Sequence, residues 1–197
     1  YIHPITDSAA KLLSETTTTP GIFAVCLPVM FSAGKIIKSS PSLLTVPVET
    51  SEPGNAGTVI RVSDALGADG VVFAGNTVDP HSNKVARASA GSLFHTPVAR
   101  ETGINDVLGQ LRAANLQILA TAADGEITLE EAEETGMLEK PTAWLLGNEA
   151  HGLSDDVAAR ADHRVSIPIR GNAESLNLAT AAAICLYQSA KAQKRAR

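Results

Sequence analysis

The sequence predicts an α/β domain built around a mostly parallel sheet, and three observations support this prediction. From Leu43 onward, short apolar runs typical of strands alternate with longer stretches typical of helices. No segment of about 20–50 residues repeats, which argues against a solenoid or a propeller. Aromatic residues make up only 4% of the chain, so Ala, Val, Leu and Ile must fill the core.

The first 42 residues are predicted to lie outside the main domain. Residues 1–30 contain, in order, a helix pattern, a helix-breaking stretch and an apolar strand pattern: Ser8–Glu15, Thr16–Gly21 and Ile22–Leu27. One helix and one strand cannot enclose a core, so this piece either packs on the main domain or is the remnant of an upstream domain. The chain begins at Tyr1 without a signal peptide, which indicates a truncated chain. Residues 31–42 are predicted to be a linker, with room for a short helix.

Residues 43–197 are predicted to be the main domain. Its strand candidates are Leu43–Val48, Val71–Ala74, Leu116–Ala120, Trp144–Leu146 and Val165–Ile169. Its helix candidates are Ala56–Leu66, Asn83–Ala90, Ile104–Ala114, Leu129–Thr135, Ser154–Ala161 and Glu174–Lys191. This alternation is that of a sheet covered by crossover helices. The basic tail Lys191–Arg197 is expected to fray.

The last strand, loop and helix of the chain form its most informative stretch. Pro168 cannot donate to a sheet ladder, so the strand ends or lies at an edge there. From Leu176 the residues are apolar on nearly every face, which predicts a buried helix. The polar loop Arg170–Ser175 between them is therefore held in place, and such loops carry function. Either Asn172 or Ser175 is a candidate cap for the helix.

Composition excludes several classes of protein. No apolar run approaches the ~20 residues that a membrane span needs. Cys26 and Cys185 both lie in apolar surroundings, as expected for core thiols of a reduced, cytoplasmic protein, and their spacing indicates no metal site. The net charge of −5 argues mildly against a nucleic-acid binder unless basic residues cluster on one face. Dinucleotide fingerprints, phosphate loops and hydrolase elbows are absent from the sequence.

The first polar segment, Glu52–Arg61, follows a predicted strand. Asn55 is a candidate helix N-cap, and Gly57 permits a close backbone approach. Taken alone, Arg61 is best interpreted as part of a surface salt bridge. At the end of a strand, however, Asn55 and Arg61 also suit an anion such as an RNA phosphate.

Two further polar segments follow later strands. Gly147 comes directly after an apolar strand, where parallel sheets bind ligands, and Glu149 follows it. In isolation, Glu149 is interpreted as an exposed turn carboxylate and His151 as a loop histidine. Ser175 and Asn177 flank Leu176 at the start of the last helix. Helix capping explains one of these polar residues but not the whole cluster.

Together, the three segments resemble the signature motifs of the SpoU family of RNA 2′-O-ribose methyltransferases, within the SPOUT superfamily. Glu52–Arg61 resembles the motif N-P-x-N-x-G-x-x-x-R, with Glu52 in place of the first Asn. Leu146–Gly152 resembles G-N-E-x-x-G. Ile167–Leu178 resembles I-P-M…S-L-N-V, with Ile for Met and Leu for Val. Order and spacing match, and the likeness covers about Leu43–Gln188.

This resemblance implies a fold, a cofactor and an assembly. The C-terminal segment would thread through a loop to form a deep trefoil knot, an exception to the rule against knotted chains. S-adenosylmethionine would bind in the knot through main-chain groups near Thr121, Gly147, Ile167 and Leu176. The chain would act as a homodimer, with each site completed by the partner. Residues 1–30 would be the end of a truncated small substrate-binding domain.

The resemblance also implies a reaction, in which a ribose 2′-hydroxyl of tRNA or rRNA takes the methyl group. It assigns Arg61 as a base-like group, with Asn55, Ser175 and Asn177 around it. Because guanidinium groups keep their proton in proteins, we favour gripping phosphate and stabilising alkoxide charge as the role of Arg61. Ser175 and Asn177 would orient the ribose or Arg61, and Glu149 would brace the loops.

Two candidate RNA contacts and two alternative functions complete the prediction. Lys84 and Arg87 are candidate RNA-binding residues, although a solvated helix face explains them equally well. The main alternative is a non-catalytic RNA-binding or ribosome-assembly protein on the same scaffold, suggested by the acidic charge and by Glu52. A weaker alternative is a hydrolase that uses Ser175. Neither a metal nor a membrane is an expected partner.

Overall fold

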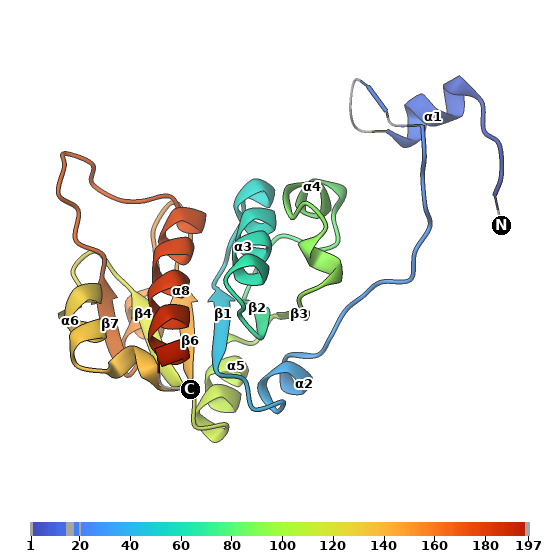
Figure 1. Ribbon diagram of the computed structural model, residues 1–197. Coiled ribbons are helices and arrows are strands. Elements are labelled where there is room, and N and C mark those ends of the chain that lie inside the picture. Colours follow the sequence, from blue (N-terminus) through green and yellow to red (C-terminus); the bar gives the residue numbers. More distant parts are fainter. Residues whose placement is uncertain (1, 15–17, 20, 196–197) are drawn as a thin grey trace.

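The computed structural model describes residues 2–14, 18–19 and 21–195, and it confirms the predicted α/β fold (Figure 1). Within these residues, seven strands form one sheet in the order β3-β2-β1-β6-β4-β7-β5, and neighbouring strands are parallel. The strands are β1 (Leu43–Pro47), β2 (Gly70–Ala74), β3 (Val98–Glu101), β4 (Gln117–Thr121), β5 (Ile127–Thr128), β6 (Thr142–Leu146) and β7 (His163–Ser166).

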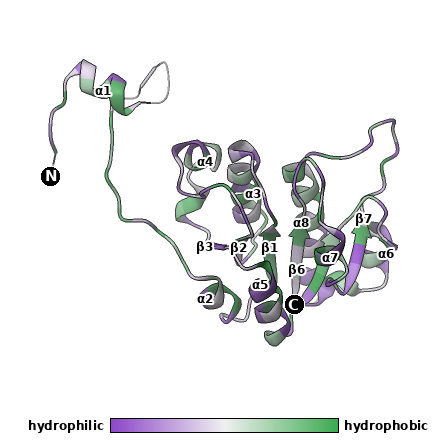
Figure 2. Ribbon diagram, turned by 180° about the vertical axis from the view of Figure 1, so that it is seen from behind, coloured by the Kyte–Doolittle hydropathy of each residue, from purple (hydrophilic) through white to green (hydrophobic). Residues whose placement is uncertain are grey.

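Helices cover both faces of the sheet, and the strand residues alternate between two apolar cores. One face packs on α2 (Ala33–Ile37), α5 (Ile104–Ala113) and α7 (Asp155–Ala158). The other packs on α3 (Pro53–Ala65), α4 (Asn83–Ala88), α6 (Leu129–Glu134) and α8 (Leu178–Arg195). In β6, for example, Leu145 faces the first core and Trp144 the second. Figure 2 shows the hydrophobic strands between these layers.

The carboxyl ends of the central strands meet at one edge of the sheet. Strand β1 pairs with β2 on one side and with β6 on the other, so the strand order reverses here. In open α/β sheets, ligands bind at the carboxyl edge near such a reversal. The loops that follow β1, β4, β6 and β7 all start from this edge.

The chain crosses over β7 between β4 and β5. Both of these strands pair with β7 around Val165, one on each side, so residues 122–126 must pass across it. We call residues 122–126 the crossing segment. A Cβ at Gly125 would lie only 2.6 Å from the Ser166 amide nitrogen, so backbone meets backbone at this point. This arrangement agrees with the expected trefoil knot, and the knot itself stays a prediction.

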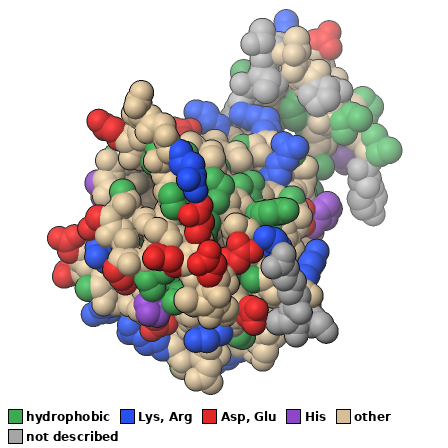
Figure 3. All heavy atoms as spheres, turned by 60° about the vertical axis from the view of Figure 1, so that its left-hand side comes forward, with side chains coloured by type: hydrophobic (Ala, Val, Ile, Leu, Met, Phe, Trp, Pro, Cys, Tyr) green, Lys and Arg blue, Asp and Glu red, His purple; other side chains and the backbone are tan. Residues whose placement is uncertain are grey.

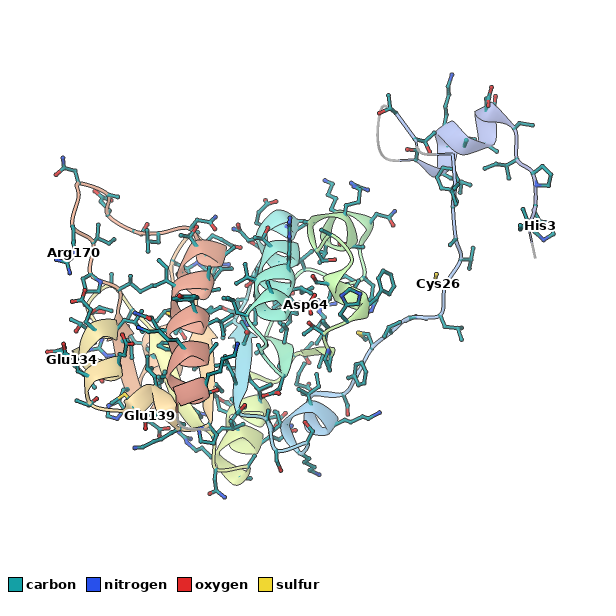
Figure 4. All side chains as sticks on the ribbon, viewed as in Figure 1. His3, Cys26, Asp64, Glu134, Glu139 and Arg170 are labelled. Atoms are coloured by element: carbon teal, nitrogen blue, oxygen red, sulfur yellow. The ribbon has the colours of Figure 1, made fainter. Side chains whose placement is uncertain are left out.

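The N-terminal residues lie away from the sheet (Figure 1). Helix α1 (Asp7–Leu13) matches most of the predicted helix, whose end at Glu15 lies outside the described residues, as does much of the predicted breaker. The predicted strand Ile22–Leu27 is wrong, because no neighbouring strand pairs with it and Val25 is fully exposed. Cys26 is therefore exposed rather than a core thiol, as Figure 4 shows. The assignment of residues 1–30 to a substrate-binding domain stays a prediction.

Several boundaries differ from the predictions for physical reasons. Residues 31–42, predicted as a linker with room for a short helix, include α2, whose apolar side chains are buried against the first core. Strand β7 begins and ends earlier than predicted, before Pro168, which confirms that this proline terminates it. The short strands β3 and β5 were not predicted, because half of β3 is polar and β5 has 2 residues.

Helix α8 also differs from its prediction. It starts at Leu178 and continues to Arg195, so the described part of the basic tail is helical. One face is buried, including Cys185, whose thiol has a pKa raised above its ordinary value by that burial. The opposite side is not buried as predicted, because Tyr187 is 59% exposed. Within the described residues, no helix is long and apolar enough to cross a membrane.

Candidate functional site

A cleft of about 590 Å³ opens at the carboxyl ends of β4, β6 and β7. Its walls are the crossing segment, the turn that follows β6, the residues around Val165, and the end of the loop that leads into α8. This volume is within the range of small-molecule sites, which is roughly 300–1,000 Å³. All four predicted cofactor-binding residues line it: Thr121, Gly147, Ile167 and Leu176.

Glycine and asparagine shape the turn after β6. Gly147 lies against the backbone of Gly152 so closely that any Cβ would collide with it. Asn148 and Gly152 exchange two backbone hydrogen bonds of 3.0 and 2.9 Å. The Asn148 side chain donates to the Glu49 carbonyl oxygen at 2.6 Å, which ties the turn to the end of β1. The sequence therefore builds a tight turn with exposed main-chain groups beside the cleft.

A chain of hydrogen bonds connects all three polar segments. The Asn55 amide group donates to Glu149 Oε1 at 3.1 Å. The oxygen of the same Asn55 side-chain amide, Oδ1, accepts from the side-chain amide group of Asn177 at 2.9 Å. The side-chain oxygen of Asn177, Oδ1, accepts from the backbone amides of Ala179 and Thr180. We call this chain, Glu149–Asn55–Asn177, the amide relay.

The amide relay corrects two capping predictions. Asn55 does not cap α3, because that helix starts at Pro53 and Glu52 caps it by accepting from the Gly54 amide at 3.3 Å. Neither Asn172 nor Ser175 caps α8, because Asn177 does so. The two asparagines are thereby placed where they face each other from different helices. Glu149 accepts a side-chain hydrogen bond from Asn55 on α3, and its role in bracing the loops stays a prediction.

Arg61 lies farther along α3 and is exposed. Among the described residues its guanidinium has no hydrogen-bond or ion-pair partner, so the surface salt bridge considered for it is not present. Ser175 is also exposed, in the loop before α8, and its hydroxyl has no partner in the described part of the chain. Ser175 lines the cleft with Glu149 and Asn177, whereas Asn55 reaches that group from α3.

Lys84 and Arg87 lie outside the cleft, on exposed positions of α4. Helix α4 packs tightly on α3 because Gly57 has no side chain; a Cβ there would lie 2.5 Å from the Ala88 Cβ. Lys84 and Arg87 thus lie on α4, which packs on the helix that carries Asn55 and Arg61. Neither basic residue lines the cleft.

One cleft residue escaped the sequence analysis, and a second was interpreted only as a loop histidine. Arg164 lines the cleft and pairs with Asp124 and with Glu126, each at 3.0 Å. Arg164 lies one residue before the predicted strand Val165–Ile169, and the two acidic residues follow a different predicted strand, Leu116–Ala120, so no spacing in the sequence connects them. His151 lines the cleft too, with Nε2 4.0 Å from Glu49 Oε2.

Two other chemistries find little support at the cleft. Among the residues that the structure describes, no three His, Cys, Asp or Glu side chains gather as metal ligands. Ser175 forms no hydrogen bond with a histidine in the same described part, which leaves the hydrolase alternative without a base.

Comparisons with known proteins agree with this geometry. The family model of the SpoU rRNA Methylase family matches residues 42–187. The 23S rRNA (guanosine(2553)-2′-O)-methyltransferase RlmP of Bacillus subtilis is 33% identical over 183 residues, which are 93% of this chain and 70% of that protein. The 23S rRNA (uridine(2479)-2′-O)-methyltransferase of Streptomyces viridochromogenes is 38% identical over 146 residues, which span 72% of this chain and 50% of that protein.

A solved structure is similar as well. The AdoMet-bound rRNA methyltransferase from Sinorhizobium meliloti superposes with a TM-score of 0.72 at 33% sequence identity, over 82% of this chain and 60% of that chain. The likeness extends over the sheet, the cleft and the three polar segments, which all lie within the matched residues 42–187. The chain therefore belongs to the SpoU rRNA methylase family.

Proposed function

We propose that the protein is an S-adenosylmethionine-dependent methyltransferase that acts on a ribose 2′-hydroxyl of RNA. The amide relay carries this proposal, because it joins the three polar segments at the mouth of a single cleft. The two curated relatives described above, from Bacillus subtilis and Streptomyces viridochromogenes, act on 23S rRNA, which supports rRNA as the substrate class.

The cleft suits S-adenosylmethionine in size and chemistry. Its walls offer main-chain groups near Gly147 and Ile167 for an adenine edge, and apolar surface from Leu176 for the ring. The Thr121 hydroxyl is held by donating to the Leu145 carbonyl oxygen at 3.2 Å, so it shapes that wall. When bound, S-adenosylmethionine supplies a methyl group on a positively charged sulfur that an oxygen nucleophile can accept.

The residues of this chain orient the nucleophile and stabilise its charge. Arg61 keeps its positive charge, so it grips a phosphate of the RNA and stabilises negative charge on the ribose oxygen. The Ser175 hydroxyl, which has no hydrogen-bond partner among the described residues, orients the ribose. The amide relay uses both ends of the Asn55 amide, so Asn55 holds the segments in place rather than binding the RNA itself.

We propose further that Lys84 and Arg87 contact the RNA backbone, because α4 lies beside the helix that carries Arg61. We also propose a homodimer. A hollow of about 550 Å³ lies between α3 and α8 and is lined by Leu66, Tyr187 and Ala190. We propose that a second copy of the chain packs into this hollow.

The free thiols of Cys26 and Cys185 fit a reducing, cytoplasmic compartment.

The test combines calorimetric titration with S-adenosylmethionine and a methyl-transfer assay on unmodified rRNA transcripts. We expect about one molecule bound per chain and 2′-O-methylated product. Arg61→Ala should reduce transfer by about a hundredfold or more, the usual loss for a charge-stabilising group, and leave cofactor binding unchanged. The control is Arg112→Ala on α5, which removes an exposed arginine outside the cleft whose guanidinium donates to the Arg160 carbonyl oxygen.

Three outcomes contradict parts of this proposal. A folded chain that does not bind S-adenosylmethionine overturns the methyltransferase. RNA binding without methyl transfer favours the non-catalytic RNA-binding or assembly protein instead. Full activity of Arg61→Ala removes Arg61 from the mechanism. Glu52 no longer supports the non-catalytic alternative, because its side chain has a structural task as the cap of α3.

A further inference from the structure

Arg164 fastens the crossing segment onto β7. Its backbone amide donates to Glu126 Oε1 at 2.8 Å, and its Nε donates to Glu126 Oε2 at 3.0 Å. Its Nη1 donates to Asp124 Oδ2 at 3.0 Å. One residue of β7 thus holds both acidic residues of the crossing segment, with Gly125 between them. We call these three side chains the Arg164 clasp: Arg164, Asp124 and Glu126.

The crossing segment is also held at its two ends, because β4 before it and β5 after it both pair with β7. The Ala122 amide donates to the Val165 carbonyl oxygen at 3.0 Å, which fixes its first residue. Gly125 has no side chain with which to pack, and Asp124 and Glu126 have side chains that are 81% and 46% exposed. Between these fixed ends, the side chains of Asp124 and Glu126 are held by the ionic hydrogen bonds of the Arg164 clasp.

The charges are arranged to favour the clasp at neutral pH. The pKa of Glu126 lies below its ordinary value, mainly because the Arg164 backbone amide donates to its carboxylate. The pKa of Arg164 lies above its ordinary value, mainly because of its hydrogen bond with Asp124.

The clasp stands at the wall of the cleft. Ala122, Ala123 and Asp124 line it from the crossing segment, and Arg164 and Val165 line it from β7. A shift of the crossing segment would change the width of the cleft directly. Among the described residues that line the cleft, neither Arg61 nor any residue of α4 is present.

We propose that Arg164 is a positioning residue that sets the affinity for S-adenosylmethionine by clamping the crossing segment against β7. The proposal rests on the proposed function, since it takes S-adenosylmethionine as the ligand of the cleft. Arg164 acts on the ligand through the wall that it holds, so it should govern cofactor binding and leave the handling of RNA unchanged.

The test measures S-adenosylmethionine binding by calorimetry for Arg164→Ala, Arg164→Lys and the double variant Asp124→Asn/Glu126→Gln. Arg164→Ala should weaken binding about tenfold, the sum expected for two partly exposed ion pairs. The double variant should weaken it similarly. Arg164→Lys should recover part of the affinity, because lysine keeps the charge and lacks the guanidinium fork. Arg112→Ala serves as the control.

Two further readouts separate positioning from general destabilisation. The KM for RNA and the kcat at saturating cofactor should stay within about twofold of the parent values. Hydrogen exchange at the Ala122 amide should accelerate in Arg164→Ala, while the fluorescence of buried Trp144 reports an intact fold.

The outcomes distinguish this proposal from the proposed function. If the parent chain binds S-adenosylmethionine and Arg164→Ala binds it equally well, the clasp has no role in affinity. Parallel losses in cofactor binding, RNA handling and folding also overturn the proposal, because they show a purely structural residue. A parent chain that does not bind S-adenosylmethionine overturns the proposed function itself, and the clasp's role in cofactor affinity with it.

Discussion

The amide relay has a direction, and that direction is set at its two ends. The Glu149 carboxylate only accepts hydrogen bonds, and the backbone amides at the start of α8 only donate them. Asn55 and Asn177 can therefore take only one amide orientation each. An asparagine amide could point in either of two directions, and here the direction is fixed because Glu149 can only accept and the backbone amides can only donate.

Asn177→Asp should break the relay, because an aspartate cannot donate to the Asn55 carbonyl oxygen. Asn55 would then have to turn its amide group toward the new carboxylate and face Glu149 with an oxygen. Adding Glu149→Gln supplies a donor at that end, so the double variant should be more active and more stable than Asn177→Asp alone. A double-mutant cycle of kcat/KM and Tm measures this coupling, expected at about 0.5–3 kcal/mol for residues in one network. Additive effects would show that relay direction does not matter.

At the scale of residues, the sequence predicted which side chains matter better than what they do. The four residues assigned to the cofactor line the cleft together with Glu149, Ser175 and Asn177. Arg61 lies farther along α3, and Asn55, which was expected to cap that helix, contacts Glu149 and Asn177 instead. Its partners, Glu149 and Asn177, come from distant parts of the chain. No local pattern reveals such a contact, and the Arg164 clasp stayed hidden for the same reason.

At the scale of elements, the pairing of α3 and α4 connects packing with function. Helix α3 places Asn55 and Arg61, and α4 places Lys84 and Arg87. Their close contact depends on Gly57, whose missing Cβ leaves room for the backbone of Val85 and the side chain of Ala88. The relative position of the two helices is therefore set by one glycine.

Gly57→Ala should push α4 away from α3. The added methyl group would meet the Val85 carbonyl oxygen and the Ala88 Cβ at 2.5 Å, so we expect a loss of about 1–3 kcal/mol in the free energy of unfolding. RNA affinity should fall as well. Gly109→Ala on α5 is the matched control, because nothing lies within 4 Å of its Cβ position. It should be neutral or stabilising by up to about 1 kcal/mol. Chemical denaturation compares the two; equal stability would contradict the packing argument.

The elements that the sequence predicted well are those with long apolar patterns. Strands β1, β2, β4 and β6 are buried and appear close to their predicted bounds. Strands β3 and β5 lie at the two edges of the sheet, where only one neighbour stabilises them and polar residues are tolerated. The prediction of a strand at Ile22–Leu27 was wrong although this run is apolar, because an apolar run becomes a strand only beside a partner strand.

At the scale of the whole molecule, charge is unevenly distributed. The net charge is −5, and acidic side chains gather in the middle of the face shown in Figure 3. Arg61, Lys84 and Arg87 lie instead on α3 and α4. A negative total charge is therefore compatible with RNA binding, because affinity depends on the local basic surface that meets the phosphates.

The proposed homodimer predicts a mass of twice 20.4 kDa in solution. Tyr187→Glu should shift the protein toward the monomer, because it places a charge on the exposed side of α8 beside the hollow that we assign to a second copy. Light scattering coupled to gel filtration measures this mass. Leu12→Glu on α1 is the control, since Leu12 is 88% exposed and lies away from that hollow. A monomeric parent chain would contradict the assembly.

The crossing over β7 also constrains how the protein is made. During synthesis, β4, the crossing segment and β5 leave the ribosome before β7 exists. They cannot reach their final positions then, because Gly125 rests on the backbone of residues 164–166 and the Ala122 amide bonds to Val165. The nascent chain must keep this region open until its last strand has arrived. The cleft is therefore among the last parts of the sheet domain to form, and only a chain that extends through β7 can contain it.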